Sequence, residues 1–120
     1  MKFLLTSAFI LFSNFSFSET IHYYEFKKGI ITVIDNSEYK INESCYQSTC
    51  SAKQALEKKI SIKKLNLKGG KNPGSVACTQ VLSGQVMMLK NIETNNVSSF
   101  CLFKDGSYIS NKAINQKVIF

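Results

Sequence analysis

The first 18 residues have the pattern of an export signal, and this pattern constrains the interpretation of everything that follows. Lys2 supplies a positive charge, and residues 3–12 form a largely apolar run. Ser16 and Ser18 place small residues at the two positions that signal peptidase reads, which predicts cleavage before Glu19. The apolar run is shorter than the roughly 20 residues that span a bilayer. We therefore expect an exported chain, periplasmic or secreted; the alternative is a buried N-terminal helix or an uncleaved anchor.

All four cysteines follow this signal, and their even number in an exported chain predicts two disulfides. Removal of the signal leaves 102 of the 120 residues, which is enough for one domain. A domain of this size buries only about 65% of its unfolded surface, so cross-links compensate for a small core. The alternative is a set of free buried thiols. No cysteine directly follows the predicted cleavage site, so we do not expect a lipoprotein. The cysteines are Cys45, Cys50, Cys78 and Cys101.

Three pairings of these cysteines are possible. Locality favours Cys45–Cys50 together with Cys78–Cys101, although the crossed pairings close longer loops and are not excluded by loop entropy. The spacing lacks the paired short cysteine motifs of a zinc site, and the sequence has only one histidine, His22. We therefore expect disulfides, and neither a bound metal nor a redox motif.

The first half of the mature chain has the pattern of antiparallel strands followed by a helix. Residues 20–26 and 30–34 are rich in aromatic and β-branched residues and flank a short turn, which predicts a β-hairpin. Residues 38–42 are expected to add a third strand after a turn at residues 35–37. Ser51 and Gln54 have the spacing of a capping box, which predicts a helix over residues 52–60.

The second half begins after Gly69-Gly70, a flexible break and candidate boundary within a single compact unit made of segments 19–68 and 69–120. Asn72 as N-cap and Pro73 at the first helical position predict a helix start, and Gly84 is expected to end that helix. Strands are predicted at residues 85–90 and 97–103, with turns at residues 95–96 and 105–107. A further strand is expected in the tail of residues 108–120, ending in Val118-Ile119-Phe120. The pattern predicts a small α+β fold, stapled by disulfides, with antiparallel β-hairpins and two short helices.

The positive charge of the chain comes from lysine alone, because the sequence contains no arginine. This excess favours anionic partners such as lipid or an acidic glycan, although a solvated lysine-rich face is the simpler interpretation. The lack of arginine argues against specific nucleic-acid recognition, which relies on the bidentate guanidinium. The candidate contacts to an anionic surface are Lys53, Lys58, Lys59, Lys63, Lys64 and Lys68.

No catalytic or cofactor motif is evident in the sequence. His22 lies inside a predicted strand, where a lone histidine is usually a surface or packing residue. Gly69-Gly70-Lys71 lacks the spacing of a phosphate-binding loop. Asp105 in the Asp-Gly-Ser turn is one acid where calcium needs several, and nothing pairs it with Glu43 for hydrolysis. We therefore expect a protein that is not an enzyme and carries no cofactor.

Two segments of the C-terminal half resemble a known family. Asn72-Pro73-Gly74-Ser75-Val76-Ala77-Cys78 and the later Cys101-Leu-Phe-Lys-Asp-Gly-Ser107 resemble the conserved pattern of a small bacterial domain family that carries a haemolysin label and has no assigned function. The similarity covers residues 72–114. It implies a small envelope protein in which a structural motif joins a capped helix to a hairpin. The residues of that motif are Asn72, Pro73, Ser75, Asp105, Gly106 and Ser107, with the two cysteines.

The chain departs from this family at several positions. A Gly-Gly pair after the helix is Ser83-Gly84 here, and the aromatic element that follows Asp-Gly-Ser in the family is absent. The chain also lacks the lipid-attachment cysteine of many members. It therefore resembles a divergent member, and the label by itself gives no mechanism.

These observations favour an exported, non-enzymatic envelope protein that presents a surface for another macromolecule. One alternative is a secreted enzyme inhibitor whose reactive tip is the loop at residues 45–50 or 91–96. The second alternative is a membrane-surface or haemolysin-like protein, which acts through residues 53–68 if they form one amphipathic helix.

Overall fold

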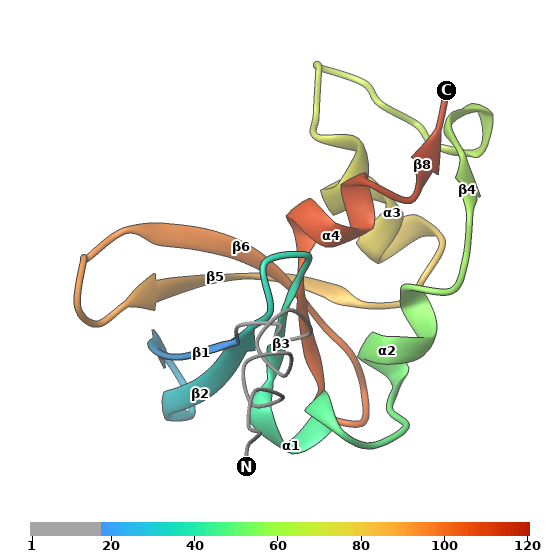
Figure 1. The fold of residues 1–120 in the computed structure, drawn as a ribbon. Coiled ribbons are helices and arrows are strands. Elements are labelled where there is room, and N and C mark those ends of the chain that lie inside the picture. Colours follow the sequence, from blue (N-terminus) through green and yellow to red (C-terminus); the bar gives the residue numbers. More distant parts are fainter. Residues whose placement is uncertain (1–17) are drawn as a thin grey trace, which may run out of the picture.

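The computed structural model describes residues 18–120, so the predicted export signal lies outside the described residues apart from Ser18. Within this range six strands form a closed antiparallel barrel in the order β1-β2-β3-β7-β6-β5 (Figure 1). The barrel strands are β1 (Glu19–Glu25), β2 (Gly29–Asp35), β3 (Lys40–Asn42), β5 (Gln85–Asn91), β6 (Val97–Leu102) and β7 (Tyr108–Ser110).

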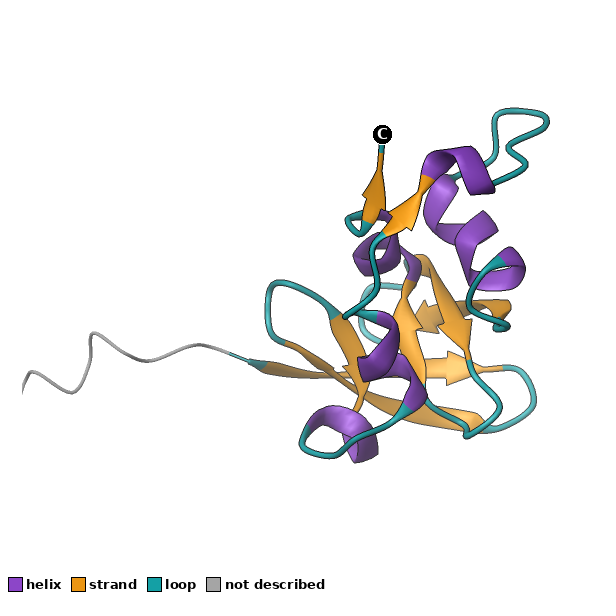
Figure 2. Cartoon of the chain, turned by 90° about the vertical axis from the view of Figure 1, so that its right-hand side faces the viewer, coloured by secondary structure: helices purple, strands orange, loops and turns teal. Residues whose placement is uncertain are grey.

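Four short helices and a second, two-stranded sheet complete the described fold. In Figure 1 the helices gather on one side of the strands, while the β5–β6 hairpin extends away from them. Figure 2 shows the two-stranded sheet standing apart from the barrel strands. These elements are α1 (Glu43–Tyr46), α2 (Ser51–Ala55), α3 (Pro73–Gln80), α4 (Asn111–Asn115), the 3-10 turn η2 (Ile62–Lys64), and the parallel strands β4 (Ile60–Ser61) and β8 (Val118–Ile119).

The two predicted hairpins are present. β1 pairs with β2 from Glu19 opposite Asp35 to Glu25 opposite Gly29, and Gly29 takes the positive φ of 84° that the turn requires. β5 pairs with β6 across a tip in which Asn95 also has a positive φ, of 63°. These hairpins form where local turn chemistry and β-branched residues agree.

The closure of the hairpins into a barrel was not predicted. It depends on contacts between segments far apart in the sequence: β3 meets β7 where Ile41 lies opposite Ile109, and β1 meets β5 where Tyr23 lies opposite Asn91. The prediction of a small antiparallel α+β fold with short helices and two disulfides is confirmed. The finer description is corrected: the hairpins close into a barrel, and the described residues contain four short helices where two were expected. Both sides of Gly69-Gly70 contribute strands to it.

The barrel separates two apolar cores. Inside it, Tyr23 and Phe100 pack edge to face with their ring centroids 5.2 Å apart, and Val33, Leu89 and Tyr108 fill the remaining space. A second core lies between the outer surface of the barrel and the helices. It contains both buried alanines of α2, the buried cysteines of α1, α3 and β6, and the inward-facing residues of α4 and β8. Its members include Ile34, Ile41, Cys45, Ala52, Ala55, Ile60, Ala77, Cys78, Cys101, Ile109, Ala113, Ile114 and Val118.

The predicted helix over residues 52–60 is wrong in length and in its cap. The helix ends at Ala55. Three hydrogen bonds close its last turn, each from a backbone amide to the carbonyl three residues earlier. Ile60 instead joins β4, where its amide donates to the Lys117 carbonyl at 2.9 Å and its side chain is buried. The N-cap is Cys50 and not Ser51, so the predicted capping box does not form. Pairing with β8 therefore overrides the helical pattern.

The second helix starts as predicted and ends differently. The Asn72 side chain accepts a hydrogen bond from the Ser75 amide at 3.2 Å, and Pro73 occupies the first turn of α3. At the other end Ser83, and not Gly84, takes the positive φ, 59°. Gly84 has a different role: a Cβ there would collide with the sulfur of Cys101 and lie 3.1 Å from that of Cys78. The expectation that Gly84 ends the helix is therefore wrong.

Both disulfides follow the pairing that locality favours. Cys45 is bonded to Cys50 beside α1, and Cys78 of α3 is bonded to Cys101 of β6. The second bridge ties the helical layer to the barrel through the outer core. Two such bonds indicate an oxidising, exported environment. In the described part of the chain, no helix is both long and apolar enough to cross a bilayer.

Candidate functional site

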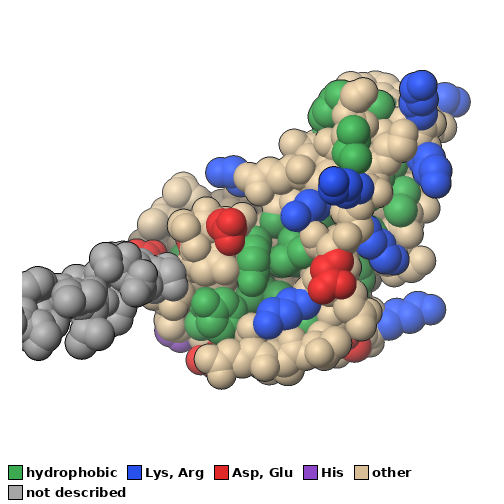
Figure 3. All heavy atoms as spheres, turned by 45° about the vertical axis from the view of Figure 1, so that its right-hand side comes forward, with side chains coloured by type: hydrophobic (Ala, Val, Ile, Leu, Met, Phe, Trp, Pro, Cys, Tyr) green, Lys and Arg blue, Asp and Glu red, His purple; other side chains and the backbone are tan. Residues whose placement is uncertain are grey.

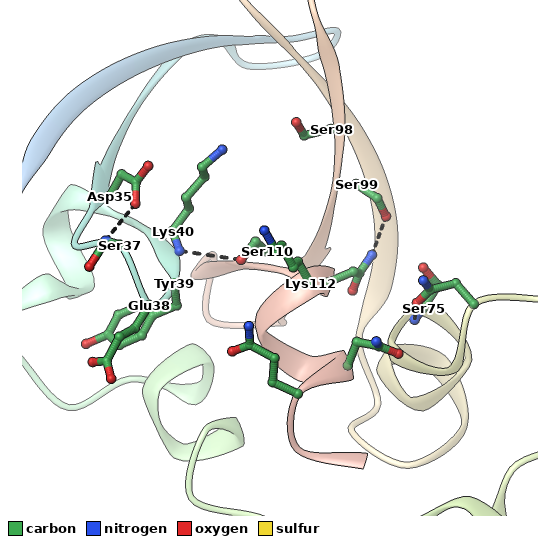
Figure 4. Close-up of a pocket in the computed structure, with 14 residues that line it drawn as sticks. Asp35, Ser37, Glu38, Tyr39, Lys40, Ser75, Ser98, Ser99, Ser110 and Lys112 are labelled. Atoms are coloured by element: carbon green, nitrogen blue, oxygen red, sulfur yellow. Dashed lines mark hydrogen bonds between the residues drawn. The ribbon is translucent and has the colours of Figure 1, made fainter.

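A pocket of about 610 Å³ lies between the β2–β3 turn, the start of α3, β6 and α4. Figure 4 shows the turn residues Asp35 to Lys40 on one side of this space, with Ser98 and Ser99 of β6 and Ser75 of α3 on the other. Its volume lies in the range of small-molecule sites in proteins.

Every residue that lines this pocket has a polar or charged side chain. Two acids and two lysines contribute charges of opposite sign: Asp35, Glu38, Lys40 and Lys112. The ten remaining side chains all carry a hydroxyl or a carboxamide: Ser37, Tyr39, Asn72, Ser75, Ser98, Ser99, Ser110, Asn111, Asn115 and Gln116. Such groups both donate and accept hydrogen bonds. The pocket therefore matches an uncharged, hydrogen-bonding ligand better than an apolar one.

One wall is the start of α3, which the sequence positions through its cap. Asn72 and Ser75 of the predicted motif both line the pocket, so the cap and the pocket wall are the same residues. Between them Gly74 lets α3 approach α4: its amide donates to the Asn115 side-chain oxygen at 3.0 Å. A Cβ at Gly74 would meet the Asn111 carbonyl and lie 2.8 Å from the Asn115 nitrogen. A larger residue would push this wall away from α4.

The adjoining wall is α4 with β6. The Asn111 amide nitrogen donates to the Ser99 hydroxyl, and the Asn111 side chain is only 3% exposed. Its other amide atom, Oδ1, is buried and has no hydrogen-bond partner in the described residues. An acceptor left unpaired in this way costs about 1–3 kcal/mol.

The third wall is the turn between β2 and β3, and it is held rigidly. Asn36 accepts hydrogen bonds from the Glu38 and Tyr39 amides at 3.0 Å each, and Asp35 accepts one from the Ser37 amide at 2.9 Å. At the edge of the barrel the Lys40 ammonium donates to the Tyr23 hydroxyl at 3.3 Å. This side of the pocket is therefore preorganised by the predicted Asp-Asn-Ser turn.

The remaining motif residues lie elsewhere and have a structural role. Asp105 accepts a hydrogen bond from the Ser51 amide at 2.8 Å, and the Ser107 hydroxyl accepts one from the Ala52 amide at 3.0 Å. Burial raises the pKa of Asp105, but hydrogen bonds from Ser107 and Ser51 outweigh it and lower that pKa to about 2. Gly106 has a φ of 86°, as the turn requires. This turn caps α2 and does not line the pocket.

The candidate lysines do not lie along one helix. Lys53 is in α2 with its ammonium 5.9 Å from the Tyr46 ring centroid, Lys63 and Lys64 are in η2, and Lys68 follows it. Figure 3 shows lysine side chains scattered over the visible face, without a continuous stripe. The condition on which the membrane hypothesis for residues 53–68 depended, one amphipathic helix, is therefore not met.

Sequence inspection found only two of the pocket residues, Asn72 and Ser75. The rest come from β6, α4 and the β2–β3 turn, and α4 itself was not predicted. The sequence Ser110-Asn-Lys-Ala-Ile-Asn115 offered a signal, because Ser110 precedes a short run with buried Ala113 and Ile114. Within residues 18–120, no three His, Cys, Asp or Glu side chains come together as a metal site would need.

Comparison with known proteins yields no relative: no protein-family model matches the chain, and no match is found among curated proteins or solved structures. The resemblance to the haemolysin-labelled family stays a prediction from residues 72–114.

Proposed function

We propose that this protein is an exported, non-enzymatic binding protein of the cell envelope, whose pocket between the barrel and α3–α4 holds part of an uncharged glycan. The main support is the chemistry of the lining, in which every neutral side chain carries a hydroxyl or an amide. Sugar hydroxyls donate and accept in the same way, so each wall can be matched.

The lining also narrows the ligand class, because its hydroxyl and carboxamide groups both donate and accept hydrogen bonds. A ligand with hydroxyl or amide N–H groups matches both functions, whereas a fully ionised phosphate or carboxylate offers only acceptors. The lining charges balance in sign, which also gives no preference for an anion. Amino sugars acetylated on nitrogen carry both kinds of donor and are the first probes to use.

The experiment is a titration of the isotopically labelled, exported protein with oligomers of N-acetylglucosamine and, separately, of glucose, followed by NMR. We expect amide shifts confined to the pocket walls, and their loss in Ser98→Phe, which fills the pocket from β6. Ser48→Phe places the same side chain on an exposed loop outside the pocket and is the matched control. Shifts that avoid the pocket, or that persist in Ser98→Phe, would contradict the proposal.

A second candidate is inhibition of an enzyme, and it has one specific observation in its favour. The β5–β6 hairpin projects from the body (Figure 1), and its exposed tip is held by its own side chains. Asn91 accepts hydrogen bonds from the Glu93 amide at 2.8 Å and the Thr94 amide at 3.1 Å. A projecting, preorganised loop is what a rigid inhibitor presents. Recovery of a hydrolase on the immobilised protein, and its loss when residues 92–95 are replaced by Gly-Ser, would support this alternative.

A further inference from the structure

The helices cover only part of the outer surface of the barrel. Strand register places Ile30 opposite Tyr24, Tyr24 opposite Lys90, and Lys90 opposite Val97, so four neighbouring strands present these side chains in one row. Alternation along the strands directs this row outward, because the intervening residues Tyr23 and Leu89 fill the barrel. The exposed fractions are 65% for Ile30, 49% for Tyr24 and 56% for Val97.

Two further residues extend this row into a patch. Met88, two positions before Lys90 in β5, shares its face and is 60% exposed. Phe26, in the β1–β2 turn next to Tyr24 and Glu25, is 81% exposed. We call the six residues the bare face: Tyr24, Phe26, Ile30, Met88, Lys90 and Val97. A cluster of exposed apolar side chains of this kind marks a binding surface more often than isolated exposed residues do.

The turn that carries Phe26 is held from beneath by a buried carboxylate. Glu25 is 1% exposed, and its two oxygens accept hydrogen bonds from the amides of Lys27 at 2.8 Å and Lys28 at 3.1 Å. The Lys28 ammonium lies 5.3 Å from the ring centroid of Tyr108. Phe26 is therefore exposed at a turn whose backbone is held in place, next to Lys27 and Lys28. Its exposure is not the result of a loose loop.

The bare face and its turn carry exposed positive charge. Lys27, Lys28 and Lys90 are exposed there, whereas Glu25 is buried and already bonded. Two exposed acids lie at its margins: Glu43 lines a hollow together with Lys28 and Ile30, and Glu93 follows Lys90 by three residues in the β5–β6 tip. In the described strands, the outward positions of β1, β2, β5 and β6 include no acidic residue. The surface thus combines an exposed aromatic side chain, aliphatic neighbours and ammonium groups, the combination that anchors proteins at an anionic lipid interface.

We propose that the bare face docks on the surface of an anionic lipid bilayer, with Phe26 entering the interface and Lys27, Lys28 and Lys90 contacting lipid headgroups. Phe26 and its turn lie at the end of β2 away from the proposed glycan pocket. Gly29 and Asp35 are the two ends of this seven-residue strand, so the turn and the pocket edge lie about 20 Å apart along it. The other edge of the bare face adjoins the pocket, because Met88 lies opposite Ser99, one of the lining residues.

The first test uses the absence of tryptophan from the sequence. Phe26→Trp gives the exported protein a single tryptophan on the bare face, and Phe120→Trp gives one at an equally exposed site, 82%, near the other sheet. Vesicles of phosphatidylglycerol mixed with phosphatidylcholine are compared with vesicles of phosphatidylcholine alone. We expect a blue shift and shielding from a water-soluble quencher for Phe26→Trp with the anionic vesicles only.

The second test measures vesicle co-sedimentation of the exported protein at low and high salt. Phe26→Ser is expected to weaken binding about tenfold, and Lys27→Gln and Lys28→Gln about fivefold each. Phe120→Ser and Lys63→Gln, matched in type but distant from the bare face, should leave binding unchanged. No sedimentation with anionic vesicles at low salt, equal binding to neutral vesicles, or greater loss in Phe120→Ser than in Phe26→Ser would overturn the proposal. None of these results bears on the glycan titration.

Discussion

Asp105 accepts a hydrogen bond from the backbone amide of Ser51 at 2.8 Å, across 54 positions of sequence. Ser107 does the same for the next amide, that of Ala52. The residue before α2, Cys50, has no capping side chain, so the Asp-Gly-Ser turn supplies the cap from another part of the chain. The Asp-Gly-Ser motif, which could be taken for a ligand site, therefore has a structural role: it joins α2 to the start of β7.

Removal of this cap should destabilise the fold measurably. Asp105→Ala leaves the Ser51 amide without its acceptor and is expected to lower the free energy of unfolding by about 1–2 kcal/mol. Urea denaturation followed by circular dichroism measures the change. Glu57→Ala, which removes an exposed acid just after the same helix, is the control and should change stability by less than about 0.5 kcal/mol. Equal effects in both variants would show that general charge is responsible.

The same carboxylate predicts a dependence of stability on acid. Its pKa is lowered from 3.8 to about 2 in the folded protein, so the unfolded chain takes up the proton first as the pH falls. The contribution of Asp105 is complete above about pH 4 and is lost towards pH 2. Because the carboxyl group is largely exposed, we expect its contribution to the free energy of unfolding to be about 1 kcal/mol. Denaturation midpoints between pH 5 and pH 2 should fall more steeply in the native protein than in Asp105→Ala.

Tyr108 predicts a second pH dependence at the alkaline end. Burial, the negative charge of Glu25 and the hydrogen bond to it raise the pKa of Tyr108 to about 12. In the unfolded chain this tyrosine ionises near pH 10. Its contribution to the stability is therefore complete below that pH and is lost as the pH rises towards 12. A phenolate absorbance step near pH 12 should be absent from Tyr108→Phe and present in Tyr24→Phe, whose side chain lies on the surface. A step that survives in Tyr108→Phe would contradict this assignment.

The two disulfides should differ in their contribution to the free energy of unfolding. The Cys78–Cys101 bridge closes 24 residues and contributes about 3.5 kcal/mol by loop entropy, against about 2 kcal/mol for the six residues from Cys45 to Cys50. Paired Cys→Ala variants, compared by urea denaturation, should show the larger loss for the first bridge. That variant also opens a cavity in the outer core, which adds to its loss. The reverse order would show that the short loop makes contacts beyond its cross-link.

Gly84→Ala should destabilise the fold, although replacing glycine by alanine usually lowers the conformational entropy of the unfolded chain and so stabilises a protein. A Cβ at this position would press against the sulfur of Cys101, and the disulfide has no free side on which to move. We expect Gly84→Ala to cost about 1–3 kcal/mol. Gln85→Ala, at the exposed next position, should be nearly neutral. A neutral Gly84→Ala would mean that the helix–barrel contact is looser than this structure describes.

The sequence could predict those elements whose causes are local. The β1–β2 hairpin, the Asn72-Pro73 helix start and the two turns at residues 35–37 and 105–107 all depend on residues within a few positions of one another. The cysteine pairs also follow from nearness along the chain. Of the pocket, only Asn72 and Ser75 could be identified, because they belong to such a local signal.

The remaining features were decided by packing between distant segments. Ile60 fits a helical pattern, yet it lies in β4 because Val118 offers it a strand partner and a buried site. Gly84 fits a helix terminator, yet its role is to make room for a disulfide. The barrel closes through Ile41 and Ile109, and that closure brings α4, β6 and the β2–β3 turn around one pocket. Such contacts depend on which surfaces meet once the local elements exist, and a periodic pattern along one segment contains no information about its partner.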